Sequence, residues 1–173
     1  MFNDFFAKDT SKKIRAVMKA KGNSGKHLGV PPYGYRLDPQ DKDHWVIDEE
    51  TAPVVKRIFD MTVAGAGPFQ IAKTLEAEKV PISRAVYARR KGKPLPDRPY
   101  YWATQTITSI LSRVEYTGCA CNFKTFSKSY KLKKRYHNAP ENIVIIPGTQ
   151  EPIVTQAQFD PMSLTLGERC GIL

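Results

Sequence analysis

The sequence predicts an α+β fold: a small mixed domain with a helix-turn-helix-like core of three helices and a short antiparallel β-hairpin or sheet. Apolar residues recur at helical spacing in three short segments between residues 52 and 113, and runs of strand composition flank these segments. A basic helix, read as the end of a longer linker helix, precedes them. With 173 residues and 41% apolar content, the chain can bury a real core.

The first segment, about residues 3–21, has helix-forming composition, but its apolar stripe is narrow. Such a stripe is typical of a helix that packs on something outside this chain. Residues 22–25, Gly-Asn-Ser-Gly, predict loss of helical character at Gly22 and a flexible joint. The hydrophobic pattern changes after this joint, so a main domain is expected to begin near Leu28.

The main domain begins with a short strand at residues 45–47 and a helix from near Ala52. A second helix starts at Pro68, since proline suits a first helical position. Residues 81–101 are expected to form a long basic loop, followed by a third helix over about 103–113.

Strand composition returns at residues 119–126 and 143–146, on either side of a basic segment that resembles a hairpin tip. A last short helix is expected near Thr155, with Phe159 as its apolar anchor. The three cysteines are an odd number, which fits a reducing cytoplasm better than a disulfide framework. Cys119-x-Cys121 lacks a second close pair of zinc ligands, so no metal and no cofactor is expected.

Charge is concentrated in three basic blocks, and the net charge is +10 with a pI near 9.6. This balance favours nucleic acid or an anionic membrane surface as partner. No apolar run approaches the roughly 20 residues of a spanning helix, so a membrane-spanning role is not expected. The three histidines have no Ser or Cys in the sequence context of a catalytic nucleophile. The sequence also has no phosphate-binding glycine loop, so no active site is expected.

The second and third helices have the order of a helix-turn-helix unit, in which the second helix enters the major groove of duplex DNA. The outer face of the third helix carries uncharged hydrogen-bonding residues, where an ordinary solvent-facing helix would carry Lys and Glu. Gln pairs well with adenine, and Ser or Thr can contact base edges or phosphates. The candidate recognition residues are Thr104, Gln105, Thr106, Thr108, Ser109 and Arg113.

Further contacts to the DNA backbone are predicted in four places, where cations or an aromatic glycine turn would meet phosphates or the minor groove. They are the first helix and its joint (Arg15, Lys19, Lys21, Lys26), the turn Tyr33, Gly34, Tyr35 and Arg36, the long loop (Arg84, Arg89, Arg90, Lys91), and the hairpin tip (Lys124, Lys128, Lys131, Lys133, Lys134, Arg135).

Several motifs, in this order, resemble the large serine recombinases of phages and conjugative transposons, within the resolvase/invertase superfamily. They are Phe2 to Phe6 with Ser11 to Arg15, Pro31 to Arg36, Val46 to Asp48 leading into Val54 to Phe59, Ile71 to Leu75, Trp102 to Leu111, Tyr116 to Gly118, and Glu151 to Ile153. The resemblance covers about residues 2–160. It implies a linker helix and hinge at residues 1–27, a DNA-binding domain at residues 28–160 and a tail at residues 161–173 that does not match the family.

This resemblance implies a DNA-binding fragment that recognises a duplex half-site and is monomeric by itself. The parent recombinase would assemble as a dimer or tetramer through its catalytic domain to integrate or excise a mobile element. The serine catalytic domain and the zinc ribbon of the family have no counterpart here, so no enzyme activity is expected of this chain. The tail 161–173 departs from the family pattern, which favours a truncation or frameshift there and an internal or engineered start at Met1.

Two alternatives stay open from the residues alone. A stand-alone helix-turn-helix transcriptional regulator would use the same helices but would need a dimerisation surface. A basic RNA-binding protein would stack single-stranded bases on exposed aromatics, for which Tyr33, Tyr35, Tyr100 and Tyr101 are the candidates.

Overall fold

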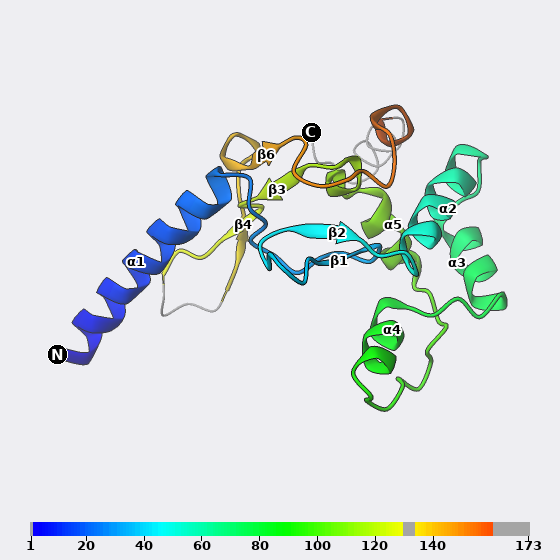
Figure 1. Ribbon diagram of the computed structural model, residues 1–173, viewed down its shortest axis with the longest axis horizontal. Helices are drawn as coiled ribbons and strands as arrows, with labels where there is room; N and C mark the ends of the chain where they lie inside the picture. Colours follow the sequence, from blue (N-terminus) through cyan, green and yellow to red (C-terminus); the bar gives the residue numbers. More distant parts are fainter. Residues whose placement is uncertain (1, 130–133, 161–173) are drawn as a thin grey trace.

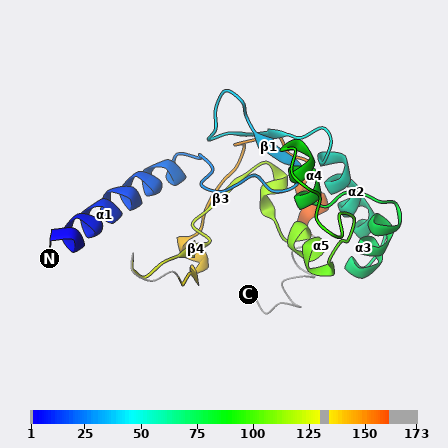
Figure 2. The ribbon, with the colours of Figure 1, turned by 90° about the horizontal axis from the view of Figure 1, so that it is seen from below.

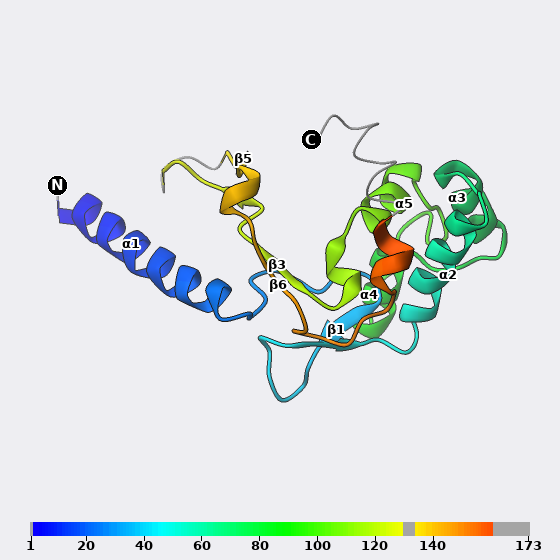
Figure 3. The ribbon, with the colours of Figure 1, turned by 90° about the horizontal axis from the view of Figure 1, so that it is seen from above.

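The computed structural model describes residues 2–129 and 134–160, with side chains from residue 6 onward. A long helix projects from one end, small two-stranded sheets lie in the middle, and a group of short helices forms the other end (Figures 1, 2 and 3). This arrangement of helices and short antiparallel strands confirms the predicted α+β class.

The projecting helix is α1, Phe2–Asn23. Its apolar residues Ile14, Val17 and Met18 are exposed, as the narrow stripe predicts. No helix among the described residues is long and apolar enough to span a membrane. Contrary to the prediction, Gly22 stays helical, since α1 continues to Asn23. Gly22 lies directly against the ring of Phe123, where a side chain would not fit.

The apolar core is built on three helices whose buried faces meet, as their helical periodicity predicts. Ile58, Phe59, Ile71, Leu75 and Ile107 are all fully buried in it. The three helices are α2 (Ala52–Val63), α3 (Pro68–Ala77) and α5 (Thr104–Leu111).

The expectation of a structureless loop at residues 81–101 is wrong, because α4 (Ser83–Arg90) forms within it. Ala85, Val86 and Ala88 are buried, so this helix packs on the domain through small apolar side chains. A helix of this length is marginal by itself, and tertiary packing of this kind is what stabilises it.

The strands of the described residues form three antiparallel pairs, each of two strands. The predicted strand at residues 45–47 pairs with residues 35–37, a segment for which the sequence predicts only a turn. The pairs are β1 (Tyr35–Leu37) with β2 (Trp45–Ile47), β3 (Ala120–Asn122) with β6 (Val144–Ile146), and β4 (Thr125–Phe126) with β5 (Tyr136–His137).

The 3-10 helices η1 (Val114–Thr117) and η2 (Pro140–Asn142) connect these parts. A final helical turn at residues 156–160 confirms the predicted last helix. Its anchor Phe159 is buried, with its ring centroid 6.4 Å from that of Phe59.

Gly34 sits where only glycine fits. Its φ is +101°, and an added Cβ would lie 2.8 Å from Val55 Cγ2 and 2.9 Å from Ile153 Cδ1. Gly65 has a similar φ of +94° but open space around it. A substitution at either glycine would therefore strain the backbone, but only one at Gly34 would also crowd neighbouring side chains.

We expect Gly65→Ala to lower the free energy of unfolding by the backbone cost alone, about 1–3 kcal/mol. Gly34→Ala should lose about 1–3 kcal/mol more, because the methyl group also overpacks the core. Urea denaturation of both variants measures the difference. Equal losses would mean that the core around Gly34 yields to a methyl group.

Candidate nucleic-acid interface

The outer face of α5 presents the polar residues that the sequence predicts. Thr104, Gln105 and Thr106 are exposed, while Thr108 and Ser109 are half-buried. The hydroxyl of Thr108 donates to the backbone oxygen of Thr104, 3.2 Å away, so it is already used within the helix. The side chains available to a ligand are therefore mainly those of Gln105, Thr106 and Ser109.

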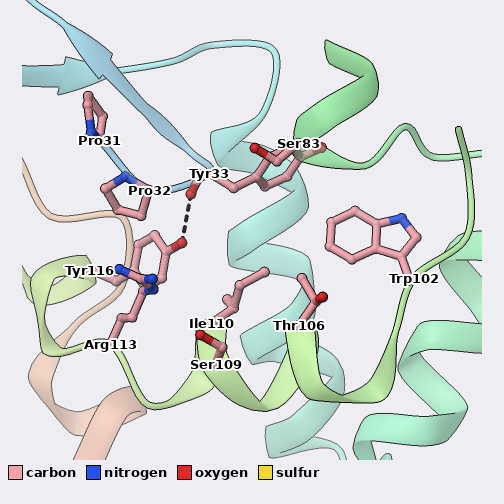
Figure 4. Close-up of a pocket in the computed structure, with 10 residues that line it drawn as sticks. All are labelled: Pro31, Pro32, Tyr33, Ser83, Trp102, Thr106, Ser109, Ile110, Arg113 and Tyr116. Carbon is pink, nitrogen blue, oxygen red and sulfur yellow. Dashed lines mark hydrogen bonds between the residues drawn. The ribbon is translucent and has the colours of Figure 1, made fainter. Parts of the chain in front are cut away.

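A hollow of about 230 Å³ opens beside this face (Figure 4). Thr106, Ser109 and the half-buried Arg113, just beyond α5, lie along one side of it. The start of α4 and the Pro31–Pro32 segment lie across from them. The residues that line the hollow are Pro31, Pro32, Tyr33, Ser83, Trp102, Thr106, Ser109, Ile110, Arg113 and Tyr116.

Hydrogen bonds from aromatic side chains hold the walls of the hollow together. Tyr116 donates its hydroxyl to the backbone oxygen of Tyr33 at 2.7 Å, and Tyr33 donates to that of Pro81 at 3.0 Å. Trp102 Nε1 donates to the oxygen of Val80 at 2.9 Å, and its ring meets that of Tyr33 edge to face. Burial raises the pKa of Tyr33 to about 12, so this phenol remains a neutral donor. These bonds fix the shape of the hollow.

An ion-pair cluster attaches α4 to the turn before α2. Arg90 donates two hydrogen bonds to the buried carboxylate of Asp48, at 2.7 and 2.9 Å, and a third to Glu50. Arg89 pairs with Glu50 as well. Burial opposes ionisation of Asp48, but the bonds from Arg90 and Thr51 outweigh it and leave the pKa of the carboxyl below its ordinary value.

Most of the glycine turn lies inside the domain, and its role as a DNA contact stays a prediction. Tyr35 is only 4% exposed and donates its hydroxyl to the backbone oxygen of Glu151, so it is a core residue. Gly34 is buried and Tyr33 is half-buried in the wall of the hollow. Only Arg36 of the four is exposed. Aromatic residues beside a glycine indicate a turn, and here that turn leads into the core.

The joint after α1 is connected to the sheet by the side chain of Asn122. The side-chain amide of Asn122 donates to the backbone oxygens of Gly22 and Lys26, at 3.1 and 2.9 Å, and its oxygen accepts from the amide of Leu28. Lys26 and the half-buried Lys21 also pair with Asp43.

Exposed cations also lie on α1 and at α4. Arg15 and Lys19 are exposed along α1, and Arg84 and Lys91 are exposed on and just after α4. Among the described residues, neither Arg84 nor Lys91 has a side-chain hydrogen bond or ion pair.

Part of the basic hairpin tip is also described. Lys124 pairs with the buried Glu115. Lys128 and Lys134 lie over the ring of Tyr136, with Nζ 4.6 and 5.4 Å from its centroid. Arg135 donates to Thr125. Lys131 and Lys133 lie outside the described residues.

His27 is a buried residue at the joint that the sequence predictions do not include. Its ring stacks on Trp45, with 3.6 Å between centroids, and its Nε2 lies 2.9 Å from Gln150 Oε1. The amide of Gln150 donates to the backbone oxygens of Glu115 and Cys119, so its oxygen accepts and His27 carries the proton on Nε2. Burial lowers the pKa of His27, more than the bond to Gln150 raises it.

Comparison with known proteins identifies the family. The family model described as Recombinase matches residues 49–169, so the chain belongs to the Recombinase family, and the resemblance in the sequence is confirmed. No curated protein matches the chain.

Two solved structures are similar to it. One, described as an LSR–DNA complex, has a TM-score of 0.55 at 15% identity, and the match covers 92% of this chain and 38% of that chain. The other, described by the sequence requirements of the Listeria innocua prophage attP site, has a TM-score of 0.45 at 21% identity and covers 91% of this chain and 52% of that one. The first match shows a shared fold. This chain thus spans about half or less of the length of these structures.

Arg90 and Arg84, on the same helix, should respond differently to substitution. Arg90→Met leaves the buried carboxylate of Asp48 without its main partner, which we expect to lower the free energy of unfolding by about 1–3 kcal/mol. Arg84→Met, the matched control, should leave stability unchanged within about 0.5 kcal/mol. Chemical denaturation at neutral pH measures both. Equal stability of the two variants would show that the cluster does not anchor α4.

His27 predicts a specific pH dependence. Because its pKa in the folded state lies below the unfolded value of about 6.5, the unfolded state binds the proton more readily. Stability is therefore fully present above about pH 6.5 and falls as the pH drops toward the folded-state pKa. His27→Phe keeps a ring on Trp45 but cannot titrate. Between about pH 7.5 and 5.5, unfolding free energies should fall more steeply in the wild type than in this variant.

Proposed function

We propose that this chain binds duplex DNA and recognises a half-site within a serine site-specific recombinase that integrates or excises a mobile element. The observation that carries the proposal is the outer face of α5. It presents the uncharged side chains of Gln105, Thr106 and Ser109 on a three-helix core, beside a hollow whose lining residues include no carboxylate. Membership of the Recombinase family supports it.

In this proposal α5 lies in the major groove. Gln105 is exposed near its first turn and would contact a base edge, where a bidentate pair discriminates between bases. The exposed cations Arg15, Lys19, Arg36 and Arg84 would contact phosphates, which gives affinity and orientation without sequence information. Thr104, Thr106, Lys91, Lys128, Lys134 and Arg135 are assigned to the same interface.

Several predicted cations are already engaged in the free protein. Lys21 and Lys26 pair with Asp43, Lys124 pairs with Glu115, and Arg89 and Arg90 pair with Asp48 and Glu50. A phosphate contact by any of them would have to replace or share an ion pair. We therefore assign these five a smaller part in binding than Arg15, Lys19 and Arg84.

We propose the division at residues 27 and 28 as the boundary between the linker helix and the DNA-binding domain. A separate tail at residues 161–173 is proposed from the sequence alone, since the match to the Recombinase family continues to residue 169. Strand cleavage and assembly into a dimer or tetramer would belong to the catalytic domain of a longer parent protein. This chain alone would act as a cytoplasmic monomer. Of the four tyrosines that the RNA-binding alternative needs, Tyr35 is buried and Tyr33 is built into a wall of the hollow, which leaves only Tyr100 and Tyr101 exposed for stacking on bases.

Selection from a random duplex library at roughly physiological salt tests the proposal. A single asymmetric site bound about 10³-fold above a scrambled duplex is the expected result. Gln105→Ala should then weaken the selected duplex by about 1–3 kcal/mol and leave the scrambled one unchanged. Equal weakening on both duplexes would remove Gln105 from base recognition.

Lys19→Ala should weaken binding to both duplexes and reduce the slope of log K against log salt by about one unit. Lys73→Ala is the matched control, because Lys73 lies on α3, pairs with Glu76 and belongs to none of the predicted contacts. If both variants change the slope equally, the effect of Lys19 is one of net charge only.

A further inference from the structure

We propose that the hollow beside α5 is a seat for one segment of the DNA backbone, a phosphodiester with its deoxyribose, and that Arg113 is the counter-charge of this phosphate. The inference rests on the proposed function and goes further, because it names the chemical group that the hollow holds. It also reassigns Arg113, which the sequence predicts as part of the base-reading face, to contact with the backbone.

The size of the hollow fits part of a polymer. At about 230 Å³ it lies below the roughly 300–1,000 Å³ of sites that enclose a whole small-molecule ligand. It is bordered by the helix face that we assign to the major groove. When a helix enters that groove, the sugar–phosphate ridges on either side lie against its flanks and the neighbouring elements. The hollow lies on such a flank of α5, between it and the start of α4.

The lining of the hollow has two chemical parts. Arg113 and the hydroxyls of Ser83, Thr106 and Ser109 can donate to phosphate oxygens, and no lining residue is acidic. The rings of Pro31, Pro32 and Trp102 and the side chain of Ile110 form an apolar wall. A phosphate joined to the apolar C–H face of a deoxyribose matches both parts, whereas a guanine edge could pair with Arg113 but would present no apolar group to the wall.

The polar groups of the hollow are free to bind. No hydroxyl hydrogen bond links Ser83, Thr106 or Ser109 to another part of the described chain, whereas the neighbouring Thr108 and Ser112 donate to their own helix. Arg113 lies 4.0 Å from Glu115, which is the limit of an ion pair, while Lys124 approaches the same carboxylate much more closely. Lys124 thus balances Glu115, and the guanidinium of Arg113 can turn to a phosphate.

The hollow is also held in shape before any ligand binds. The hydrogen bonds of Tyr33, Tyr116 and Trp102 connect its walls. A seat that is already formed costs little ordering free energy when the backbone enters it. A phosphate fixed there would set how deeply α5 enters the groove, and so place Gln105 against its base pair.

The experiment uses the whole chain and the selected duplex with single methylphosphonates, which remove the charge of one phosphate at a time. In the wild type we expect one position at which neutralisation weakens binding roughly tenfold. In Arg113→Gln the same methylphosphonate should cause no further loss. Ser83→Ala, on the other side of the hollow, should reduce the effect at the same position and no other. In Arg135→Gln, the control on the hairpin, that position should keep its full effect.

The possible outcomes distinguish failure of the phosphate seat from failure of the proposed DNA-binding function. If Arg113→Gln leaves every methylphosphonate effect unchanged but abolishes the response to 7-deazaguanine at one base pair, Arg113 reads a base and the phosphate seat is excluded. If Arg113→Gln and Arg135→Gln behave alike at every phosphate, the hollow holds no particular one and the seat is likewise excluded. If the wild type binds no duplex at all, the proposed function itself is wrong.

Discussion

The side chain of Tyr116 is the contact on which the arrangement of this domain depends. It is fully buried, with its ring centroid 6.0 Å from those of Tyr35 in β1 and Phe59 in α2. Its hydroxyl donates to the backbone of Tyr33. Burial raises the pKa of this phenol well above its usual range, so it stays a neutral donor. One side chain, placed just after α5, thus joins the sheet, the helical core and the segment before β1.

The hydrogen bond of Tyr116 also helps to shape the candidate interface. The bond from Tyr116 places residues 31–33 across from α5, and the bond from Tyr33 to Pro81 carries the restraint on to the start of α4. Arg90 attaches the other end of α4 to Asp48. Because both ends of α4 are held, it can form one side of a hollow although it is too short to be stable by itself. The polar face of α5 and its flank are therefore positioned by buried interactions.

The sequence predicts the elements whose signals are local. The periodic apolar residues of α2, α3 and α5 and the run 45–47 are such signals, and these elements form where expected. The sequence does not predict α4, because its buried face consists of alanines and one valine among arginines and gives only a weak apolar pattern. In the site, the exposed face of α5 follows from periodicity as well. The pairing of Arg90 with Asp48 joins residues 42 positions apart, and the burial of Tyr35 depends on Tyr116, so neither could be read from neighbouring residues.

The joint between α1 and the domain shows why such distant contacts matter for function. Gly-Asn-Ser-Gly is a flexible sequence in isolation, but Asn122 uses its whole side-chain amide to hold the backbone around it. Gly22 lies so close to Phe123 that a Cβ at this position would overlap the phenyl ring. The direction of α1 is thereby tied to β3, and through the chain to η1 and α5. If DNA is the partner, the cations of α1 and the polar face of α5 would meet it as parts of one body at a fixed spacing, so that a contact made by one restricts where the other can bind.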